Sequence, residues 1–189
     1  MSRWWSEALA GPIHGDQDWI AVQSLLGDAS GVTALAAHVA RRNRKKLPFL
    51  LSGDQADLAD DEDVVDMFTS NALVGAILLL LRQMDDQLRV IKTRPIWSGE
   101  LEARGLRFRS AFGEIKNAPL MLNHLGDYIF ETDAMNNPEV KKWPHPQGGV
   151  TFSNEDGRIT GYVLFGVTYP LERVLDAAKD LSPVDFPTV

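Results

Sequence analysis

Apolar residues between Asp63 and Ile91 recur at the spacing of one helical face. They return every three or four positions, at Val64, Phe68, Ala72, Ala76, Leu80, Met84 and Leu88. This period is typical of a helix with one side buried. The stretch from Ala72 to Leu81 has no polar side chain, which predicts that the middle of the helix is covered on every side. We therefore expect a long, buried central helix over residues 61–92.

A membrane span is not expected from this apolar run. A helix needs about 20 apolar residues to cross the hydrocarbon core of a bilayer. Here the run is bounded by Asp66 on one side and by Arg82, Asp85 and Asp86 on the other. Charged residues so close to the centre of a span are costly, so we expect no membrane partner.

Two shorter helices are predicted ahead of the central helix. Asp16 is suited to cap a helix over residues 17–26, and Gly27 is suited to end it. Ser30 is suited to cap a second helix over residues 31–46. The sequence thus predicts a break in the chain between these two helices.

The segments that follow the central helix give weaker signals. Pro95 predicts its end, because proline disfavours helical geometry in the residue before it. Residues 98–117 fit either a strand or a loose helical face, and the spacing of their large apolar side chains favours a helix. Pro119 is suited to the first turn of a further helix, which we expect to extend to Thr132.

The clearest β signal lies near the end of the chain. Residues 150–153 and 158–165 are rich in strand-forming side chains, and the polar segment 154–157 between them ends in glycine. Two such runs around a short polar turn predict a β-hairpin. We expect an antiparallel hairpin over residues 150–168, in which Gly166–Thr168 extends the second strand.

The fold class follows from these elements. Pro170 begins an amphipathic pattern that predicts a C-terminal helix to Leu181, with residues 182–189 as a tail. Several helices with one small antiparallel sheet make a mainly helical α+β fold, packed around the central helix of residues 61–92. The length of 189 residues fits one globular domain, residues 1–189.

Composition narrows the classes of protein to consider. The hydrophobic share of 44% is ordinary for a globular protein and argues against extensive disorder. The absence of cysteine excludes disulfide scaffolds, thiolate metal sites and cysteine nucleophiles. The first residues lack the uninterrupted apolar segment of a signal peptide, so we expect a cytoplasmic protein.

Acidic residues are concentrated just before the central helix. The formal net charge is −7, which attracts basic partners and repels phosphate backbones. Carboxylates ahead of a helix also favour its positive end, so these residues have a structural explanation as well as a functional one. As a contact surface they would engage a basic protein. The candidate residues are Asp54, Asp57, Asp60, Asp61, Glu62 and Asp63.

A proline-rich loop supplies two more candidate contact residues. His145 lies between Pro144 and Pro146, close to Trp143. Proline restricts the backbone on both sides, so the loop is predicted to be rigid and able to contact a partner or ligand. We therefore add Trp143 and His145 to the candidate partner-binding residues.

Five cations lie within Arg41–Lys46, at the predicted end of a helix. Cations stabilise the negative end of a helix dipole, and this structural explanation is the simpler one. The functional alternative is a patch that binds phosphates, an acidic partner or a nucleic acid. Because the whole chain is acidic, nucleic acid is the less favoured partner.

Two histidine clusters are candidates for catalysis. His14, Asp16 and Asp18 have a spacing that could hold a divalent metal, and His124 and Asp127 would share one face of a helix. Structural roles explain each cluster as well, Asp16 as a helix cap and the helical pair as a surface hydrogen bond. The chain has no phosphate-binding glycine loop, zinc-protease motif or nucleophile elbow. We therefore expect no cofactor and no resident metal.

A small, acidic, cysteine-free chain without catalytic motifs is similar in profile to bacterial immunity or antitoxin-type inhibitors. Adaptor domains and phage accessory proteins share this profile. The leading hypothesis is a non-enzymatic protein-binding domain whose acidic face engages a basic protein, such as a toxin. The first alternative is a metal-assisted or acid–base hydrolase that uses the histidine clusters. The second is a nucleic-acid-contacting regulator that uses Arg41–Lys46.

Overall fold

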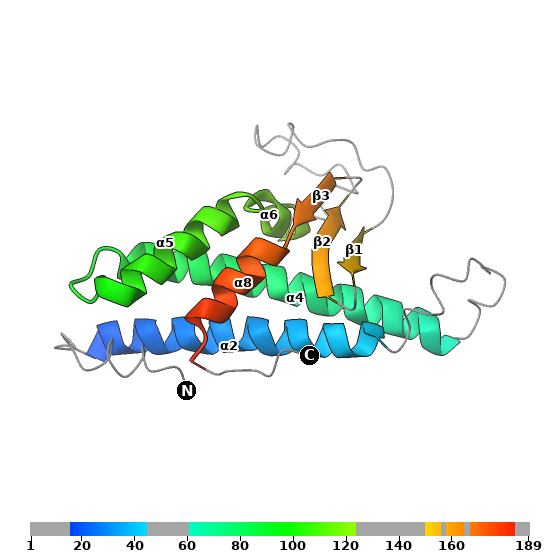
Figure 1. Cartoon of the computed structure of the whole chain (residues 1–189), viewed down its shortest axis with the longest axis horizontal. Coiled ribbons are helices and arrows are strands. Elements are labelled where there is room, and N and C mark those ends of the chain that lie inside the picture. Colours follow the sequence, from blue (N-terminus) through cyan, green and yellow to red (C-terminus); the bar gives the residue numbers. More distant parts are fainter. Residues whose placement is uncertain (1–15, 45–60, 124–149, 156–157, 165–166, 184–189) are drawn as a thin grey trace.

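The chain forms a set of helices and one small sheet, and two long helices dominate it (Figure 1). The structure is a computed structural model and describes residues 16–44, 61–123, 150–155, 158–164 and 167–183. Its elements are α2 (Asp16–Arg44), α4 (Asp61–Ile91), α5 (Gly99–Gly113), α6 (Asn117–Asn123), β1 (Val150–Glu155), β2 (Arg158–Leu164), β3 (Val167–Pro170) and α8 (Glu172–Leu181). The predicted mainly helical α+β fold is confirmed.

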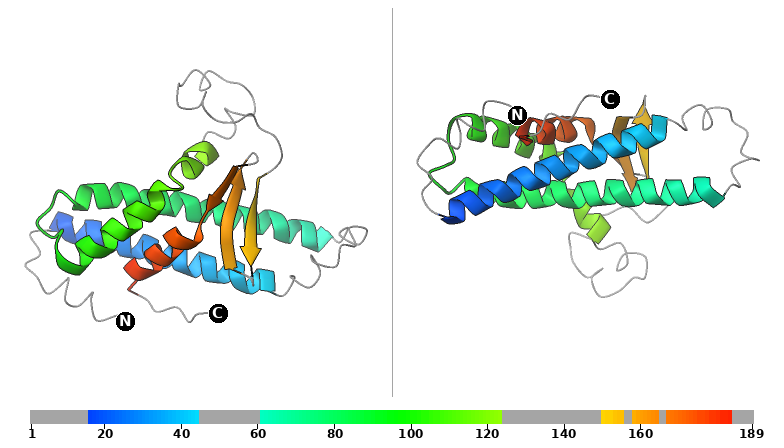
Figure 2. Two further views of the ribbon diagram at one scale, coloured as in Figure 1. Left: turned by 45° about the horizontal axis from the view of Figure 1, so that its top comes forward. Right: turned by 90° about the horizontal axis from the view of Figure 1, so that it is seen from below.

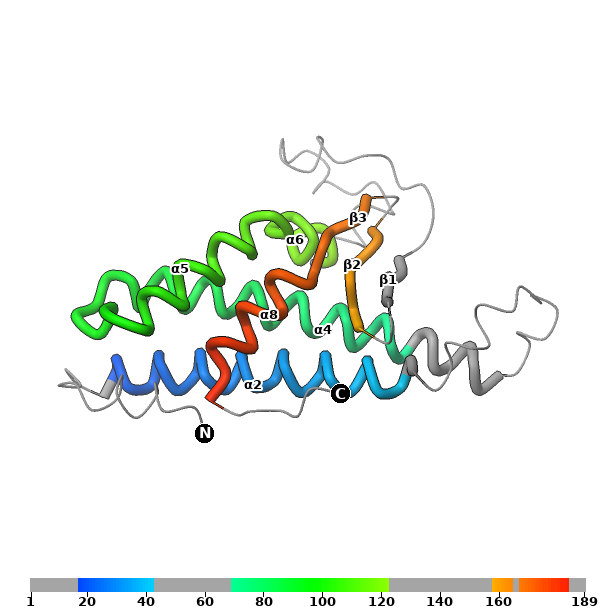
Figure 3. Tube along the Cα trace, viewed as in Figure 1, coloured from blue at the N-terminus to red at the C-terminus, as the bar shows by residue number. Residues whose placement is uncertain are grey.

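The two long helices, α2 and α4, run side by side in opposite directions (Figures 2 and 3). Contacts along the pair show this direction. Asp18, near the start of α2, lies 3.7 Å from the guanidinium of Arg94, just beyond the end of α4. Further along, the Gln87 amide of α4 donates a hydrogen bond to Ser24 of α2 at 2.8 Å. The sheet packs across this pair, with β2 on α2 and β1 on α4. α8 packs on α2 and α5, and α5 also packs on α4.

The inward side of α4 is the centre of the core. Its fully buried side chains are Val74, Ile77, Leu78, Leu81, Met84, Leu88 and Ile91. Burying one leucine-sized side chain contributes about 1.5–3 kcal/mol, so this side supplies much of the folding free energy. The prediction that Ala72–Leu81 is covered on every side is wrong, because Leu79 is 41% exposed. The elements that pack on α4 leave one of its sides uncovered.

The break predicted near Gly27 and Ser30 is also wrong, because α2 continues through both residues. A glycine inside a helix costs about 1 kcal/mol relative to alanine. Leu25 and Val32, on either side of Gly27, are fully buried, and burying one such side chain outweighs that cost. The Ser30 hydroxyl lies 3.3 Å from the hydroxyl of Ser182, at the end of α8. Tertiary packing has overridden the local stop and cap signals.

The ambiguous segment after α4 is helical, as the apolar spacing favours. α5 buries Phe108 and Phe112 on one face, with the two rings stacked at a centroid distance of 6.0 Å. Gly105 allows the Trp97 ring to pack against α5, since a Cβ at this position would collide with that ring. Pro119 lies in the first turn of α6, as predicted, and the expected continuation of this helix to Thr132 lies outside the described residues.

The sheet is antiparallel with the strand order β1-β2-β3. The predicted hairpin is confirmed as β1 and β2, with a bulge between Ser153 and Asn154. The prediction that Val167 and Thr168 extend the second strand is wrong, because they begin β3, which pairs back on β2. This return places Tyr169 directly opposite Tyr162 on one face of the sheet, where Tyr162 is buried in the core.

The predicted C-terminal helix is confirmed as α8. Its buried side chains are Val174, Ala178 and Leu181. The guanidinium of Arg104 in α5 donates a hydrogen bond to the Asp180 carbonyl at 2.7 Å, and Arg107 lies 3.5 Å from the Asp180 carboxylate. α8 therefore joins α5 through both apolar and polar contacts.

Candidate functional site

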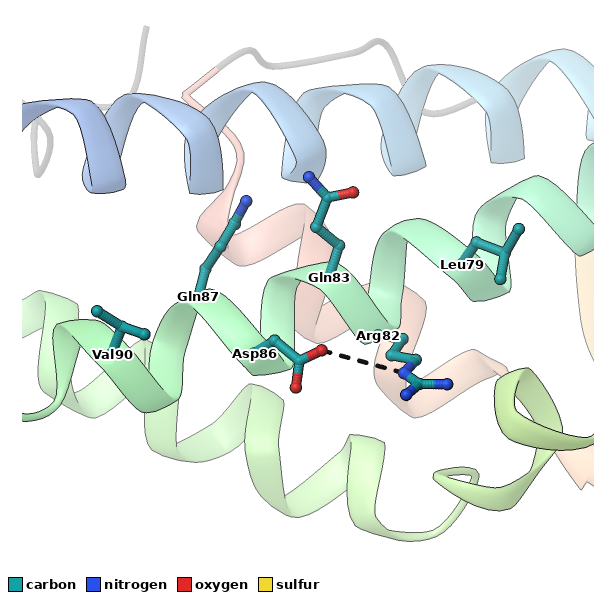
Figure 4. A pocket seen from close by; sticks show the side chains of 6 residues that line it. All are labelled: Leu79, Arg82, Gln83, Asp86, Gln87 and Val90. Carbon is teal, nitrogen blue, oxygen red and sulfur yellow. Dashed lines mark ion pairs between the residues drawn. The ribbon is translucent and has the colours of Figure 1, made fainter. Parts of the chain in front are cut away.

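An open hollow of about 560 Å³ lies on the uncovered side of α4, beside α2 (Figure 4). Its lining residues all come from α4, and positions 79, 83, 86 and 90 follow the spacing of one helical stripe. Figure 4 shows Leu79 and Val90 at the two ends, with Gln83 and Gln87 directed toward α2. We call the lining residues the outer stripe; they are Leu79, Arg82, Gln83, Asp86, Gln87 and Val90.

Large apolar side chains remain exposed on this side of the molecule. Leu79 is 41% exposed and Val90 is 53% exposed. On α2, Ile20 is 62% exposed, and the contacts of Asp18 and Ser24 with the end of α4 place Ile20 at the level of Val90. Val90 and Ile20 therefore form one exposed apolar group and Leu79 a second, with the polar residues of the outer stripe between them; exposed apolar groups bordered by polar residues are typical of protein-contact surfaces.

Gln87 fixes the position of α2 beside the hollow. Its side-chain nitrogen donates hydrogen bonds to the Ser24 hydroxyl and to an Asp28 carboxylate oxygen, each at 2.8 Å. Burial raises the pKa of Asp28, and the hydrogen bond from Gln87 opposes that rise. These two bonds hold α2 beside the hollow, whose lining residues come from α4.

Two adjacent carboxylates, Asp85 and Asp86, lie on different sides of α4, one facing the core and the other facing solvent. The Asp85 side chain is only 5% exposed and lies 2.7 Å from Arg89 and 3.1 Å from Arg109 of α5. The Asp86 side chain is 59% exposed, and its nearest cations, Arg82 and Arg89, lie at 4.0 Å. Asp85 therefore joins α4 to α5, whereas Asp86 is held loosely and is accessible from outside.

The predicted acidic contact residues are described only in part. Asp61, Glu62 and Asp63 form the first turn of α4, where carboxylates interact favourably with the positive end of the helix dipole. The first turns of α4 extend beyond the end of α2 (Figure 1). The remaining candidates, Asp54, Asp57, Asp60, Trp143 and His145, lie outside the described residues.

The predicted catalytic clusters are not assembled by the part of the chain that is described. Asp18 is buried beside Arg94, which gives its carboxylate a structural partner. Asp16 is the first residue of α2, and His14, His124 and Asp127 lie outside the described ranges. Within those ranges, no group of three or more His, Asp or Glu side chains could hold a metal ion.

The basic segment is also described in part. Arg41 is exposed near the end of α2, and Arg42 is half-buried with an interaction of its own. Lys45 and Lys46 lie beyond the last described residue of this helix. The described part of this segment contributes no residue to the outer stripe.

One stretch among the described residues, Gln17–Arg42 in α2, has the length and apolar composition of a membrane-crossing helix. The core helix of a globular protein meets the same criterion, and α2 packs along α4. The absence of a membrane partner therefore stays a prediction.

Sequence reasoning did not find the outer stripe, although a signal for it exists. Gln83 and Asp86 are polar positions within an apolar helix, and they mark a side that faces water. One further step of the same spacing in each direction reaches Leu79 and Val90. No family model, curated protein or solved structure matches this chain.

Proposed function

We propose that this protein is a non-enzymatic protein-binding domain that presents an acidic face to a basic partner. The proposed role is that of an inhibitor of the immunity or antitoxin type. One observation carries the proposal: α4, the helix at the centre of the fold, begins in the acidic run and leaves one side uncovered. The same helix thus offers charge at its start and exposed apolar groups along its outer side.

Electrostatics supports a basic partner. The net charge is −7, and Asp61, Glu62 and Asp63 add their charge at the end of α4 that extends past α2. A concentrated acidic surface steers a basic protein into encounter and speeds association, and this effect weakens as salt is added. The expected signature is therefore an association rate that falls with ionic strength.

The test compares two charge variants of equal net charge. In the first, Asp60, Asp61, Glu62 and Asp63 are replaced by their amides. Tagged wild type first captures its partner from the lysate of its own cells, and the association rate with the purified partner is then measured across a salt series. We expect a rate at least about tenfold lower at low salt and a flatter salt dependence, because steering is lost.

The matched control replaces Glu100, Glu102, Glu172 and Asp176 by their amides. Glu100, Glu102 and Glu172 also lie in the first turns of helices, so the control loses the same charge and similar helix-dipole stabilisation. The proposal requires the control to associate nearly as fast as wild type. Equal rates for wild type and the first variant would remove the acidic run from the binding site.

A further inference from the structure

The outer stripe fits a second copy of itself, and we infer that the protein self-associates through an antiparallel contact between two α4 helices. This inference goes beyond the proposed binding of a basic partner. It is tested at the outer stripe and not at the acidic residues, so it can fail or succeed independently of that proposal. Three features of the molecule support it: the order of residue types along the outer stripe, the charges on it and the space beside α2.

The order of residue types along the stripe is the same in both directions. From one end it is apolar, polar, polar, apolar, at Leu79, Gln83, Asp86 and Val90, with intervals of four, three and four residues. Such four-and-three spacing is that of a coiled-coil seam. A two-fold axis midway between Gln83 and Asp86 therefore places Leu79 of each copy against Val90 of the other. Both exposed apolar side chains are then removed from water.

The charges select the antiparallel direction. In knobs-into-holes packing, Asp86 of one copy enters the hole formed by Leu79, Arg82, Gln83 and Asp86 of the other, which brings it to Arg82, whose charge also offsets the nearby Asp86 of that copy. Within one copy this pair is loose, at 4.0 Å, with side chains 39% and 59% exposed, so little is lost when it forms between copies. A parallel pair would instead place Arg82 beside Arg82 and Asp86 beside Asp86.

The neighbouring helix leaves room for this contact. Gly27 lies on the exposed part of α2 and has open space where a Cβ would be. Ile20 adds apolar surface at the level of Val90. With a rise of 1.5 Å per residue, the two α4 starts at Asp61 would lie roughly 70 Å apart, at opposite ends of the dimer. Self-association therefore leaves both acidic ends accessible.

Charge reversal tests the inference by sedimentation velocity over a dilution series. Arg82→Glu places like charges around Asp86 of the other copy, and Asp86→Arg does the same around Arg82. We expect the wild type to dimerise and each variant alone to dissociate at a concentration at least about tenfold higher. An equimolar mixture of the two variants is expected to dimerise again, because each new charge faces its opposite.

The control reverses another exposed ion pair, between Arg107 and Asp180 of α5 and α8, and is expected to leave the dimer unchanged. The chain has no cysteine, so a mixture of Leu79→Cys and Val90→Cys proteins gives an independent readout by disulfide cross-linking. Antiparallel pairing predicts a cross-link in the mixture, and Leu79→Cys alone would cross-link only in a parallel pair. A wild type that stays monomeric, a dimer insensitive to both reversals, or a mixture that fails to recover would each overturn the inference.

Discussion

The two sides of α4 carry the same kinds of residue and have opposite environments. Leu78 and Leu81 are fully buried, whereas Leu79, between them, is 41% exposed. The adjacent carboxylates differ in the same way, with Asp85 held between two arginines and Asp86 largely in solvent. Residue type alone does not distinguish these neighbours. The elements that pack on one side of α4 decide which residue supports the fold and which is available for binding.

Truncation of a leucine on each side should show the largest difference. Leu81→Ala removes a fully buried side chain and is expected to lower the free energy of unfolding by about 2–5 kcal/mol. Leu79→Ala removes exposed surface and is expected to change it by less than about 0.5 kcal/mol. Denaturant unfolding of both variants measures the difference. Equal losses would mean that Leu79 is part of the core.

The adjacent carboxylates give the next largest contrast. Asp85→Asn weakens charge-assisted contacts with Arg89 and Arg109 and is expected to cost about 1.5–3 kcal/mol. Asp86→Asn affects an exposed, loose pair and is expected to cost at most about 1 kcal/mol. Unfolding curves recorded at low and high salt would separate them, since salt screens the exposed pair more strongly. A larger loss for Asp86→Asn would contradict the assignment of the two sides.

A smaller, stabilising effect is expected at Gly27. This residue lies inside the continuous helix α2 with open space around its Cβ position. Gly27→Ala should therefore raise the free energy of unfolding by about 0.5–1 kcal/mol, because alanine loses less conformational entropy in a helix. If the helix ended at Gly27 in a left-handed conformation, the same change would destabilise the protein instead.

In the sheet, two paired tyrosines also differ in burial, and this difference should affect the free energy of unfolding only at alkaline pH. Burial raises the pKa of Tyr162 from 10.0 to about 12 and also raises the pKa of Tyr169, its cross-strand neighbour. The unfolded chain loses the Tyr162 proton first, so the free energy of unfolding should fall as the pH rises from 10.0 to about 12. Tyr162→Phe should flatten this decline, and Tyr169→Phe should flatten it less. The free energy of unfolding, measured across that pH range, would contradict this assignment if it declined more steeply in Tyr162→Phe than in Tyr169→Phe.

The sequence predicts best what depends on one segment alone. The period of apolar residues in α4 and the strand-forming runs of β1 and β2 are local signals, and they predicted the helix and the hairpin correctly. The break in α2 was predicted from equally local signals at Gly27 and Ser30. It failed because burial of Leu25 and Val32 against other elements outweighs the cost of an internal glycine.

The outer stripe could be predicted only in part. Gln83 and Asp86 reveal a polar side of α4, and their spacing leads to Leu79 and Val90. The position of α2 beside the outer stripe depends on the hydrogen bonds of Gln87 to Ser24 and Asp28. Nothing near these residues in the sequence indicates that they meet. β3 was not predicted for the same reason, because its residues form a strand only by returning to pair with β2.

We expect α4 to support the fold with one side and to bind protein with the other. Sedimentation velocity of Leu79→Glu beside the wild type tests it most directly, with Leu106→Glu on α5 as a similarly exposed control. A charge at position 79 should weaken self-association at least about tenfold, while the free energy of unfolding changes by less than about 0.5 kcal/mol. Identical sedimentation of Leu79→Glu and wild type at every concentration would contradict the claim.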